Sequence, residues 1–326
     1  MDISIIIVSY NTCALLRDCL LSVLEKTRGV AYEILVVDNA SHDESCAMVE
    51  KEFPEARLIR NRENLGFSKA NNQAIKESRG DYVLLLNSDT VLENNAVEIL
   101  FEFMQAHPRA GACGPLLLNA DKTVQRSIDT HPTVISMMLR LNRNRSWRFF
   151  SDKYHPRAFG YSKRCRITDG WLTGAVLMIR KAVFPEVGLL DEAYFFMMED
   201  CDWGLAVSRS SWETWFVPEA VVTHLLGSSG KSHSEEQKIF GEVQCLRQHR
   251  YYVRKNFGPV CCGLYRSVVC CRYATKLIRK VIAVALSSPG KRPRAIYKRK
   301  LAAQLLCASM EIGNESAPKD RFFPAS

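Results

Sequence analysis

The first half of the chain alternates between short apolar runs and segments with helical spacing. Four runs rich in Ile, Val and Leu occupy residues 3–10, 32–40, 56–61 and 81–90. Each is followed by a segment of helical length and spacing. Strands separated by helices predict βαβ units, and therefore an α/β fold with a doubly wound, mostly parallel central sheet and helices on both faces.

The second half has a looser pattern. Residues 110–118 have the composition of a further strand. Residues 121–165 are basic, rich in Asn and without a clear period, which predicts a long loop region near a binding face. Regular patterns resume after this region. They predict a strand followed by a helix within residues 170–184, a helix that begins near Glu199 and a strand that ends at His224.

Polar side chains follow each of the four predicted strands at its carboxyl end. They are Ser9, Tyr10, Asn11, Asp38, Asn39, Asn61, Asn64, Asn87 and Asp89. For any single member, turn chemistry is an equally good explanation, because Asn and Asp tolerate tight backbone geometry. Ligands of open α/β sheets bind beyond the carboxyl ends of the strands, so four polar ends on one rim favour a ligand site.

Asp89 and His224 are the candidate ligands of a divalent cation. Asp89 ends an apolar strand, with Asn87 two residues before it on the same side. A carboxylate held at a strand end, with open positions toward solvent, suits Mg²⁺ or Mn²⁺, which also bind phosphate oxygens. An imidazole from His224 would favour Mn²⁺ slightly, although a lone His is more often structural. Asp38, at another strand end, could accept a hydrogen bond from a ribose hydroxyl or a pyrimidine N–H.

The segment MEDCDWG supplies Glu199, Asp200 and Asp202. Acidic residues in the first turn of a helix stabilise its dipole, and this alone accounts for two of the three. The preceding residues 194–198 are all aromatic or Met. Desolvation by such neighbours raises the pKa of a carboxylate toward the range in which it can act as a base. We expect Asp200 to be that base.

The basic charge of the chain is concentrated in its last part. The formal net charge is +9, and from about Arg247 onward Lys and Arg greatly outnumber Asp and Glu. Residues 257–306 predict basic amphipathic helices, which lie in a membrane interface more readily than across it. The alternative is a solvated basic helix packed on its own domain. No stretch is apolar over the roughly 18 residues that a membrane-spanning helix needs.

Two domains are therefore expected. Residues 1–230 form the α/β domain, and a mobile loop at 227–233 spans its boundary. Residues 231–326 form a basic, largely helical, membrane-associating region whose last residues, 314–326, are disordered. The twelve cysteines and the start of the chain, which lacks the features of a signal peptide, indicate reduced thiols rather than a disulfide framework or a zinc site. We expect a cytoplasmic location, peripheral on the inner face of the cytoplasmic membrane.

Several common motifs are missing. The sequence has no G-x-G-x-x-G after its first strand, no G-x-x-x-x-G-K-[ST] and no serine nucleophile elbow. This disfavours a dinucleotide-binding Rossmann site, a P-loop and a serine hydrolase. What remains is a set of carboxylates with amides and one histidine.

The ordered motifs resemble those of family-2 inverting glycosyltransferases with the GT-A fold, most closely a rhamnosyltransferase-like branch. They are IIIVSYNT, EILVVDNASHDES, RNRENLGFSKANNQAI, GDYVLLLNSDTVLE, GWLTGAVLMIRK, FFMMEDCDWGLAV and VPEAVVTH. The resemblance covers roughly Ile3 to His224.

This resemblance implies a role for each candidate residue. Tyr10 and Asp38 would hold the base and ribose of a sugar nucleotide, and Asn64 and Asn72 would help to line its pocket. Asn87 and Asp89 would form the motif that binds the donor and the metal, with His224 as the second metal ligand. Trp171, Gly174 and Glu199 would contact the acceptor. Asp200 would be the catalytic base.

The implied reaction is inverting sugar transfer, assisted by Mg²⁺ or Mn²⁺. The first expectation is rhamnose from dTDP-rhamnose, moved to a polyprenyl-diphosphate-linked saccharide at an anionic membrane surface. The alternative donor is a UDP-hexose. A nucleotidyltransferase is disfavoured because no Gly-rich basic loop follows the first strand. A non-catalytic membrane scaffold or nucleic-acid-binding protein is disfavoured because the rim is acidic and the excess basic charge lies in the tail, so we expect no nucleic-acid partner.

Overall fold

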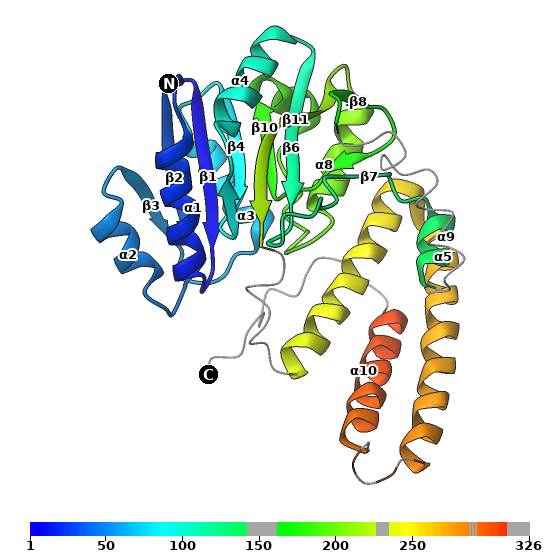
Figure 1. Ribbon diagram of the computed structural model, residues 1–326. Coiled ribbons are helices and arrows are strands. Elements are labelled where there is room, and N and C mark those ends of the chain that lie inside the picture. Colours follow the sequence, from blue (N-terminus) through cyan, green and yellow to red (C-terminus); the bar gives the residue numbers. More distant parts are fainter. Residues whose placement is uncertain (142–161, 226–234, 287, 289, 291, 312–326) are drawn as a thin grey trace. The chain divides into compact units, whose positions relative to one another are not determined.

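The computed structural model describes residues 1–141, 162–225, 235–286, 288, 290 and 292–311. The predicted loop at 227–233, the predicted disorder at 314–326 and most of the second half of the predicted loop region 121–165 lie outside these residues. The described chain forms two compact units, and each is treated separately below (Figure 1). The division falls after Lys231 and, unlike the predicted domains, assigns a helix at Val134–Leu141 to the second unit.

The first unit is built on a nine-stranded mixed sheet, which confirms the predicted α/β class. The four predicted strands form one parallel half in the order β3-β2-β1-β4. Their bounds are β1 Ile3–Ser9, β2 Tyr32–Asp38, β3 Ala56–Arg60 and β4 Tyr82–Asn87. Because all four point the same way, their polar carboxyl ends share one edge.

The other half of the sheet mixes directions. β10 lies antiparallel between β4 and β6, and β6 runs parallel to β11. The short strands β5 and β8 both pair antiparallel with β11, and β7 pairs with β9 in a separate two-stranded sheet. The bounds are β5 Thr90–Leu92, β6 Ala110–Leu118, β7 Ile128–Asp129, β8 Cys165–Ile167, β9 Trp171–Leu172, β10 Val176–Arg180 and β11 Glu213–His224.

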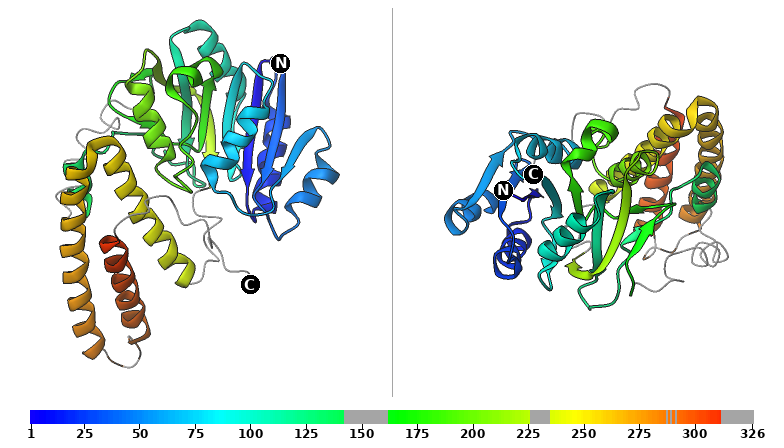
Figure 2. Two further views of the ribbon diagram at one scale, coloured as in Figure 1. Left: turned by 180° about the vertical axis from the view of Figure 1, so that it is seen from behind. Right: turned by 90° about the horizontal axis from the view of Figure 1, so that it is seen from above.

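Both faces of the sheet are buried, as the near-continuous apolar runs predict. Side chains alternate between faces, so Ile5 and Ile7 join one core cluster and Ile6 joins the other. Helices α1, α2 and α4 contribute to the first cluster, whereas α3 and α8 contribute to the second; the helices on the two sides are visible in Figure 2. The bounds are α1 Cys13–Lys26, α2 Ser45–Glu52, α3 Phe67–Glu77, α4 Ala96–Ala106 and α8 Glu199–Ser208, with η2 Lys181–Val183 and α7 Phe184–Val187 after β10.

An irregular strand brings its end to the rim. The register of β11 against β6 shifts between Val217 and Val221, around Pro218, which has no N–H to give to a ladder. Beyond this shift β11 also pairs with β5, and His224 is the register partner of Thr90. The irregularity therefore allows one strand to serve two neighbours and to end beside the polar end of β4.

The second unit is helical. It contains α5 Val134–Leu141, α9 Glu235–Ala285 and α10 Arg292–Met310. α9 kinks at Gly258, which has a φ of 85° and precedes Pro259. α10 packs against α9. Arg247 forms an ion pair with Glu311, and Arg250 donates to the carbonyl oxygens of Ala308 and Glu311. Within the described residues, no helix combines the length and the hydropathy that crossing a membrane requires.

Candidate functional site

Hydroxyl contacts join the ends of β1 and β4. Thr12 Oγ1 lies 2.9 Å from Ser9 Oγ and 3.1 Å from Ser88 Oγ, and all three side chains are buried. Asn11, with a φ of 53°, accepts from the backbone N–H of His42 through its Oδ1 at 2.7 Å. These hydrogen bonds therefore connect the loops that follow neighbouring strands and hold the rim in a defined conformation.

Asp38 places a buried carboxylate at this rim. Its carboxylate is 3% exposed, and Oδ2 accepts from the backbone N–H of Ser41 at 2.9 Å. Oδ1 is buried and has no close N–H or O–H donor within the described residues, and burial, followed by the charge of Asp38 and a hydrogen bond to it, raises the pKa of the nearby Cys46 thiol to about 11. A thiol is only a weak donor, so the Asp38 carboxylate is suited to accept from a ligand hydroxyl or N–H as well, and its predicted nucleotide contact stays a prediction.

The amides near Asp38 mainly serve the protein itself. Asn39 donates to the carbonyl oxygen of Gly66 and accepts from Asn61, while Asn64 accepts from the backbone N–H of Gly66. Gly66 has a φ of 81°, and a Cβ there would lie 2.5 Å from the carbonyl oxygen of Phe195. This loop therefore packs directly against the segment that leads into α8.

Asn72 is also occupied by contacts within the chain. Its Nδ2 donates to the carbonyl oxygen of Leu190 at 2.7 Å and to Glu192 at 3.1 Å, and its Oδ1 accepts from the N–H of Leu190. This geometry favours positioning of residues 190–192 over direct contact with a nucleotide. The predicted nucleotide contact of Asn72 stays a prediction. Tyr10 is half-buried at the rim, and burial raises the pKa of its hydroxyl.

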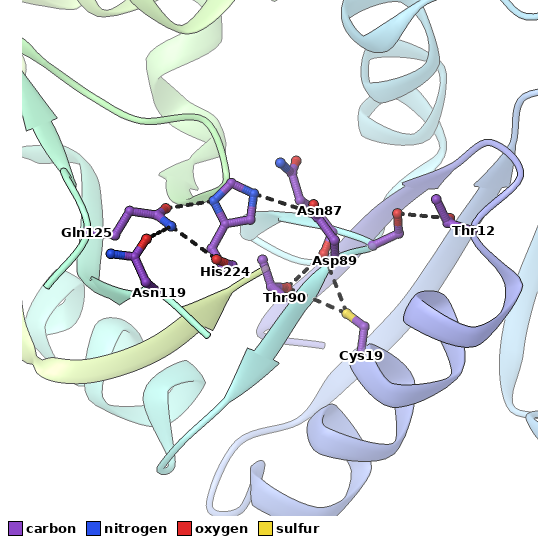
Figure 3. Close-up of polar contacts among 9 residues, drawn as sticks. Thr12, Cys19, Asn87, Asp89, Thr90, Asn119, Gln125 and His224 are labelled. Atoms are coloured by element: carbon purple, nitrogen blue, oxygen red, sulfur yellow. Dashed lines mark hydrogen bonds and ion pairs between the residues drawn. The ribbon is translucent and has the colours of Figure 1, made fainter. Parts of the chain in front are cut away.

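Asp89 and His224, which are 135 positions apart in the sequence, meet at the ends of β4 and β11 (Figure 3). His224 Nε2 lies 3.2 Å from Asp89 Oδ1, and the N–H of Leu225 donates to the carbonyl oxygen of Asp89. The imidazole is buried, and its Nδ1 lies 2.8 Å from Oε1 of Gln125. The structure therefore brings together the two residues predicted to bind a cation.

The donor set fits a divalent cation. Asn87 is the last residue of β4, and its Oδ1 is buried with no partner in the described part of the chain. A carboxylate, an imidazole and an amide oxygen are ligands that Mn²⁺ accepts, with Mg²⁺ preferring the oxygens. No group of three or more His, Cys, Asp or Glu side chains within the described residues is placed to hold a metal. The protein would thus supply only part of the coordination sphere, and phosphate oxygens and water the rest.

Glu199 and Asp200 begin α8 after a strained approach. Met197 and Met198 have φ values of 78° and 74°, two consecutive non-glycine residues in the left-handed region. Such residues cost about 1–3 kcal/mol each, and they cluster at functional sites. The N–H of Phe67 donates to the carbonyl oxygen of Phe195 at 2.7 Å and anchors this approach to α3.

The two carboxyl groups at this helix start differ in their hydrogen bonding. Asp200 Oδ2 accepts from the N–H of Gly174 at 2.9 Å, and Oδ1 accepts from the N–H of Cys201 at 2.7 Å. Glu199 is buried, and its Oε2 has no partner within the described residues. Both residues lie in the first turn of the helix, but the carboxylate of Asp200 accepts from the backbone N–H groups of two other residues, which stabilise its negative charge.

The pKa values follow from this difference. Burial, followed by the negative charge of Asp200, raises the pKa of Glu199 to about 8. Burial also raises the pKa of Asp200, but bonds from Gly174, Cys201 and the side chain of Trp171 oppose it. Asp200 is therefore the member of the pair that ionises first, and Glu199 keeps its proton to higher pH.

Trp171 and Gly174 frame this carboxylate pair. A Cβ at Gly204, in α8, would lie 2.5 Å from Cβ of Trp171, so only glycine allows β9 to approach the helix this closely. The Trp171 ring stacks on His131 with 5.8 Å between centroids. The predicted acceptor-side residues Trp171, Gly174 and Glu199 thus surround Asp200, while their contact with an acceptor stays a prediction.

Sequence reasoning missed two features of the site. One is Gln125, which lies in the region predicted to be a loop and whose partner His224 is 99 positions away. The other is the left-handed pair Met197 and Met198. A single Gln in an aperiodic segment carries no signal of its own, and Met gives no indication of a positive φ.

Comparisons with known proteins agree with this geometry. The family model described as "Glycosyl transferase family 2" matches residues 4–172. An N-acetylglucosaminyl-diphospho-decaprenol L-rhamnosyltransferase of Mycobacterium tuberculosis is 30% identical over 204 residues, which are 59% of this chain and 66% of the relative. The O-antigen biosynthesis protein RfbC of Myxococcus xanthus is 29% identical over 212 residues, 63% of this chain and 16% of that protein.

Solved structures show the same fold at low identity. The mannosyltransferase PcManGT from Pyrobaculum calidifontis, in complex with GDP-Man and Mn²⁺, has a TM-score of 0.52 at 14% identity, covering 94% of this chain and 85% of its own. GalNAc-T7 with UDP, GalNAc and Mn²⁺ has a TM-score of 0.57 at 16% identity, covering 92% of this chain and 54% of its own. These likenesses show the fold and confirm the expected GT-A architecture.

Proposed function

Because the chain belongs to glycosyl transferase family 2, we propose that it is an inverting glycosyltransferase acting on a nucleoside-diphosphate sugar. One observation carries this proposal. Gly174 and Ala175 are consecutive: the N–H of Gly174 donates to Asp200, and the carbonyl oxygen of Ala175 accepts from the N–H of Asn87 at 2.9 Å. Two adjacent residues thus connect the candidate base to the strand end that carries the candidate cation ligands.

The proposed reaction uses the two carboxylate sites for different tasks. Asp200 accepts the proton of an acceptor hydroxyl as that oxygen forms a bond to the anomeric carbon. The bond from the anomeric carbon to the nucleoside diphosphate breaks on the opposite face, and its electron pair leaves with the diphosphate. Gly174 and Cys201 orient the Asp200 carboxylate through their N–H groups.

Asp89 and His224 would hold the divalent cation, with Asn87 beside them. When bound, such a cation neutralises the charge that develops on a diphosphate leaving group. Asp38, whose buried Oδ1 has no close N–H or O–H donor within the described residues, would accept from the ribose or the base of the nucleotide. Protonated Glu199 would keep a second negative charge away from Asp200 and could donate to an acceptor oxygen.

For the donor we propose rhamnose carried on dTDP, with a UDP-hexose as the alternative. The support is the rhamnosyltransferase relative, which this chain matches over 66% of that protein's length. The test is a panel of radiolabelled nucleotide sugars, assayed for hydrolysis and transfer with and without Mn²⁺. We expect turnover of dTDP-rhamnose that EDTA abolishes. Metal-independent turnover, or none with any nucleotide sugar, would contradict the proposal.

For the acceptor we propose a polyprenyl-diphosphate-linked saccharide, reached from the inner face of the cytoplasmic membrane. The relative's name specifies such an acceptor. The second unit offers a matching surface, since residues 243–310 include Lys and Arg but no Asp or Glu. An acid-free basic segment is complementary to anionic lipid headgroups.

Five exposed apolar side chains lie in the last turns of α9 and the first turns of α10, or between them. We name these residues the hairpin tip: Ile278, Val281, Ile282, Leu286 and Ile296. Arg279 and Lys280 lie among them in sequence, and Figure 1 shows the end of α9 beside the start of α10. Exposed apolar residues interleaved with basic ones favour peripheral insertion into an anionic interface.

Co-sedimentation with vesicles tests the membrane proposal. Ile278→Ser with Ile282→Ser should reduce binding to vesicles of anionic lipid by about tenfold or more, since each buried CH₂ contributes about 0.8 kcal/mol. Val260→Ser is a matched control, because Val260 is 75% exposed on the same helix but lies outside the hairpin tip. Equal binding by the double variant and the control would contradict the proposal.

A further inference from the structure

We propose that Gln125 is a positioning residue that keeps the proton of His224 on Nδ1 and so leaves Nε2 as a lone pair for a divalent cation beside Asp89. This inference rests on the proposed function, because the cation belongs to that site. Gln125 and His224 are both buried, and Gln125 Oε1 lies 2.8 Å from His224 Nδ1 (Figure 3). The argument is a chain of hydrogen bonds in which each group determines the role of the next.

The chain begins at Asp121. Its Oδ1 accepts from the hydroxyl of Thr123 at 2.6 Å, and this bond with the backbone N–H of Thr123 lowers the pKa of the carboxyl. An ionised carboxylate can only accept, so Thr123 must donate its single proton there. The Thr123 oxygen is then left as an acceptor for the neighbouring amide.

Asn119 and Gln125 take their orientations from this point. Asn119 Nδ2 donates to Thr123 Oγ1 at 2.9 Å, which places Asn119 Oδ1 toward Gln125. Gln125 Nε2 donates to that oxygen at 2.9 Å and to the carbonyl oxygen of His224 at 3.0 Å. With both hydrogens of its NH₂ group facing acceptors, Gln125 must present its oxygen to the imidazole.

His224 is therefore constrained at one nitrogen. An amide oxygen accepts only, so Nδ1 must carry a proton to donate to it. In the neutral ring, Nε2 then has a lone pair, and it lies 3.2 Å from Asp89 Oδ1, which is also an acceptor. Neither atom can donate to the other, and a metal cation that accepts both lone pairs would satisfy the two of them.

This is the arrangement that metal-binding histidines use. A ligating imidazole normally donates its other N–H to a fixed acceptor, and loss of that acceptor typically costs 10–100-fold in metal affinity. The Asp89 carbonyl oxygen accepts from the N–H of Leu225, so the strand end that carries His224 is held against Asp89 as well. Gln125 thus sets the direction of the ring's lone pair without itself touching the cation.

The test measures Mn²⁺ binding directly, by electron paramagnetic resonance of free Mn²⁺ in the presence of dTDP, for the full chain and its variants. Gln125→Leu, which removes the acceptor, should weaken Mn²⁺ binding about 10–100-fold. Thr223→Val is the matched control. Thr223 precedes His224 in β11, where successive side chains point to opposite faces, and its hydroxyl donates to Glu93. We expect Thr223→Val to bind Mn²⁺ within about twofold of wild type, and dTDP affinity without metal to be the same for all three proteins.

A spectroscopic measurement separates positioning from mere loss of structure. In protein labelled with ¹⁵N-histidine and free of metal at high pH, the His224 signals, identified by their absence in His224→Ala, should show the Nδ1–H tautomer. In Gln125→Leu they should show a mixture or the Nε2–H tautomer. Gln125→Glu keeps an acceptor for Nδ1 and should retain the wild-type tautomer.

The outcomes are distinct. Wild-type Mn²⁺ affinity in Gln125→Leu, or an Nε2–H tautomer in the wild-type protein, overturns the inference. If the wild-type protein binds no Mn²⁺ with dTDP or UDP, the metal part of the proposed function fails, and the inferred role toward a cation fails with it. In that case the tautomer spectra still report whether Gln125 sets the proton on His224.

Discussion

The first unit has two sites built on a carboxylate, one at Asp89 and one at Asp200, and the neighbours of the two carboxylates differ in kind. Asp89 faces a base, because His224 Nε2 lies 3.2 Å from its carboxylate. Asp200 neighbours another acid, and the pKa of Glu199 is raised to about 8 by burial and by the charge of Asp200. At Asp89 and His224, the facing lone pairs favour binding of a cation. At Glu199 and Asp200, burial and the proximity of the two carboxyl groups favour loss of only one of their two protons.

The difference shows that environment, not residue type, assigns the roles. Two backbone N–H groups hold the charge on Asp200, while a buried amide holds the ring beside Asp89. The residues 174–175 link the two sites through backbone hydrogen bonds. Substitutions that exchange a carboxylate for its amide should therefore have different consequences at each site.

The largest effect is expected for Asp200→Asn. The amide cannot accept the acceptor proton, and a positioned base contributes about 10²–10⁴-fold, so kcat should fall by that factor. Affinity for the donor nucleotide should remain near wild type. Asp202→Asn is the matched control in the same helical turn, since its amide oxygen can still accept from the Tyr194 hydroxyl. Wild-type kcat in Asp200→Asn would exclude it as the base.

A somewhat smaller effect is expected for Asp89→Asn. Replacing the charged ligand should reduce kcat/KM by roughly 10²–10³-fold, the scale of one lost electrostatic contact to a developing charge. Unlike Asp200→Asn, it should also weaken Mn²⁺-dependent nucleotide binding, measured by calorimetry. If both variants show the same pattern of lost turnover with unchanged metal binding, the division of roles between the two sites is wrong.

The smallest effect on turnover is expected for Glu199→Gln, which mimics the protonated acid. We expect kcat within about tenfold of wild type near neutral pH, because the candidate base Asp200 and its backbone donors are unchanged. The informative readout is stability against pH, measured by urea unfolding with circular dichroism.

The sign of this pH dependence follows from the raised pKa. The folded state keeps the Glu199 proton up to about pH 8, whereas the ordinary value in the unfolded chain is 4.5. Between these values folding takes up a proton, so the contribution of Glu199 to stability declines as pH rises through this window. Each tenfold difference in proton affinity is worth about 1.4 kcal/mol. Glu199→Gln should thus gain stability relative to wild type at pH 8.5 and gain nothing at pH 4; an equal difference at both pH values would contradict the raised pKa.

The parallel half of the sheet was predictable because its pattern is local. Runs such as residues 82–86 are apolar throughout, and each is bounded by a helix with its own spacing, so strands, helices and their shared polar edge follow from neighbours in sequence. Asp38, Asp89 and Asp200 were identifiable for the same reason: each stands at the end of a strand or the start of a helix. The antiparallel placement of β10 between β4 and β6 had no such signal.

The partners of the site residues depend on long-range contacts. Asn72 has the same surroundings in sequence whether it binds a nucleotide or, as the structure shows, the backbone of Leu190, 118 positions away. The role of Gln125 depends on its contact with His224, which the fold brings close at the end of β11. The proton held by Glu199 likewise depends on burial and on the charge of Asp200, which a sequence pattern does not measure.

The most direct test of the central claim is a crystal structure of the protein with dTDP and Mn²⁺, with the metal located by its anomalous scattering. We predict a single strong peak bonded to a carboxylate oxygen of Asp89 and to Nε2 of His224, with diphosphate oxygens completing the coordination and the nucleoside beside Asp38. A manganese peak away from Asp89, or a nucleotide bound at another edge of the sheet, would contradict the account.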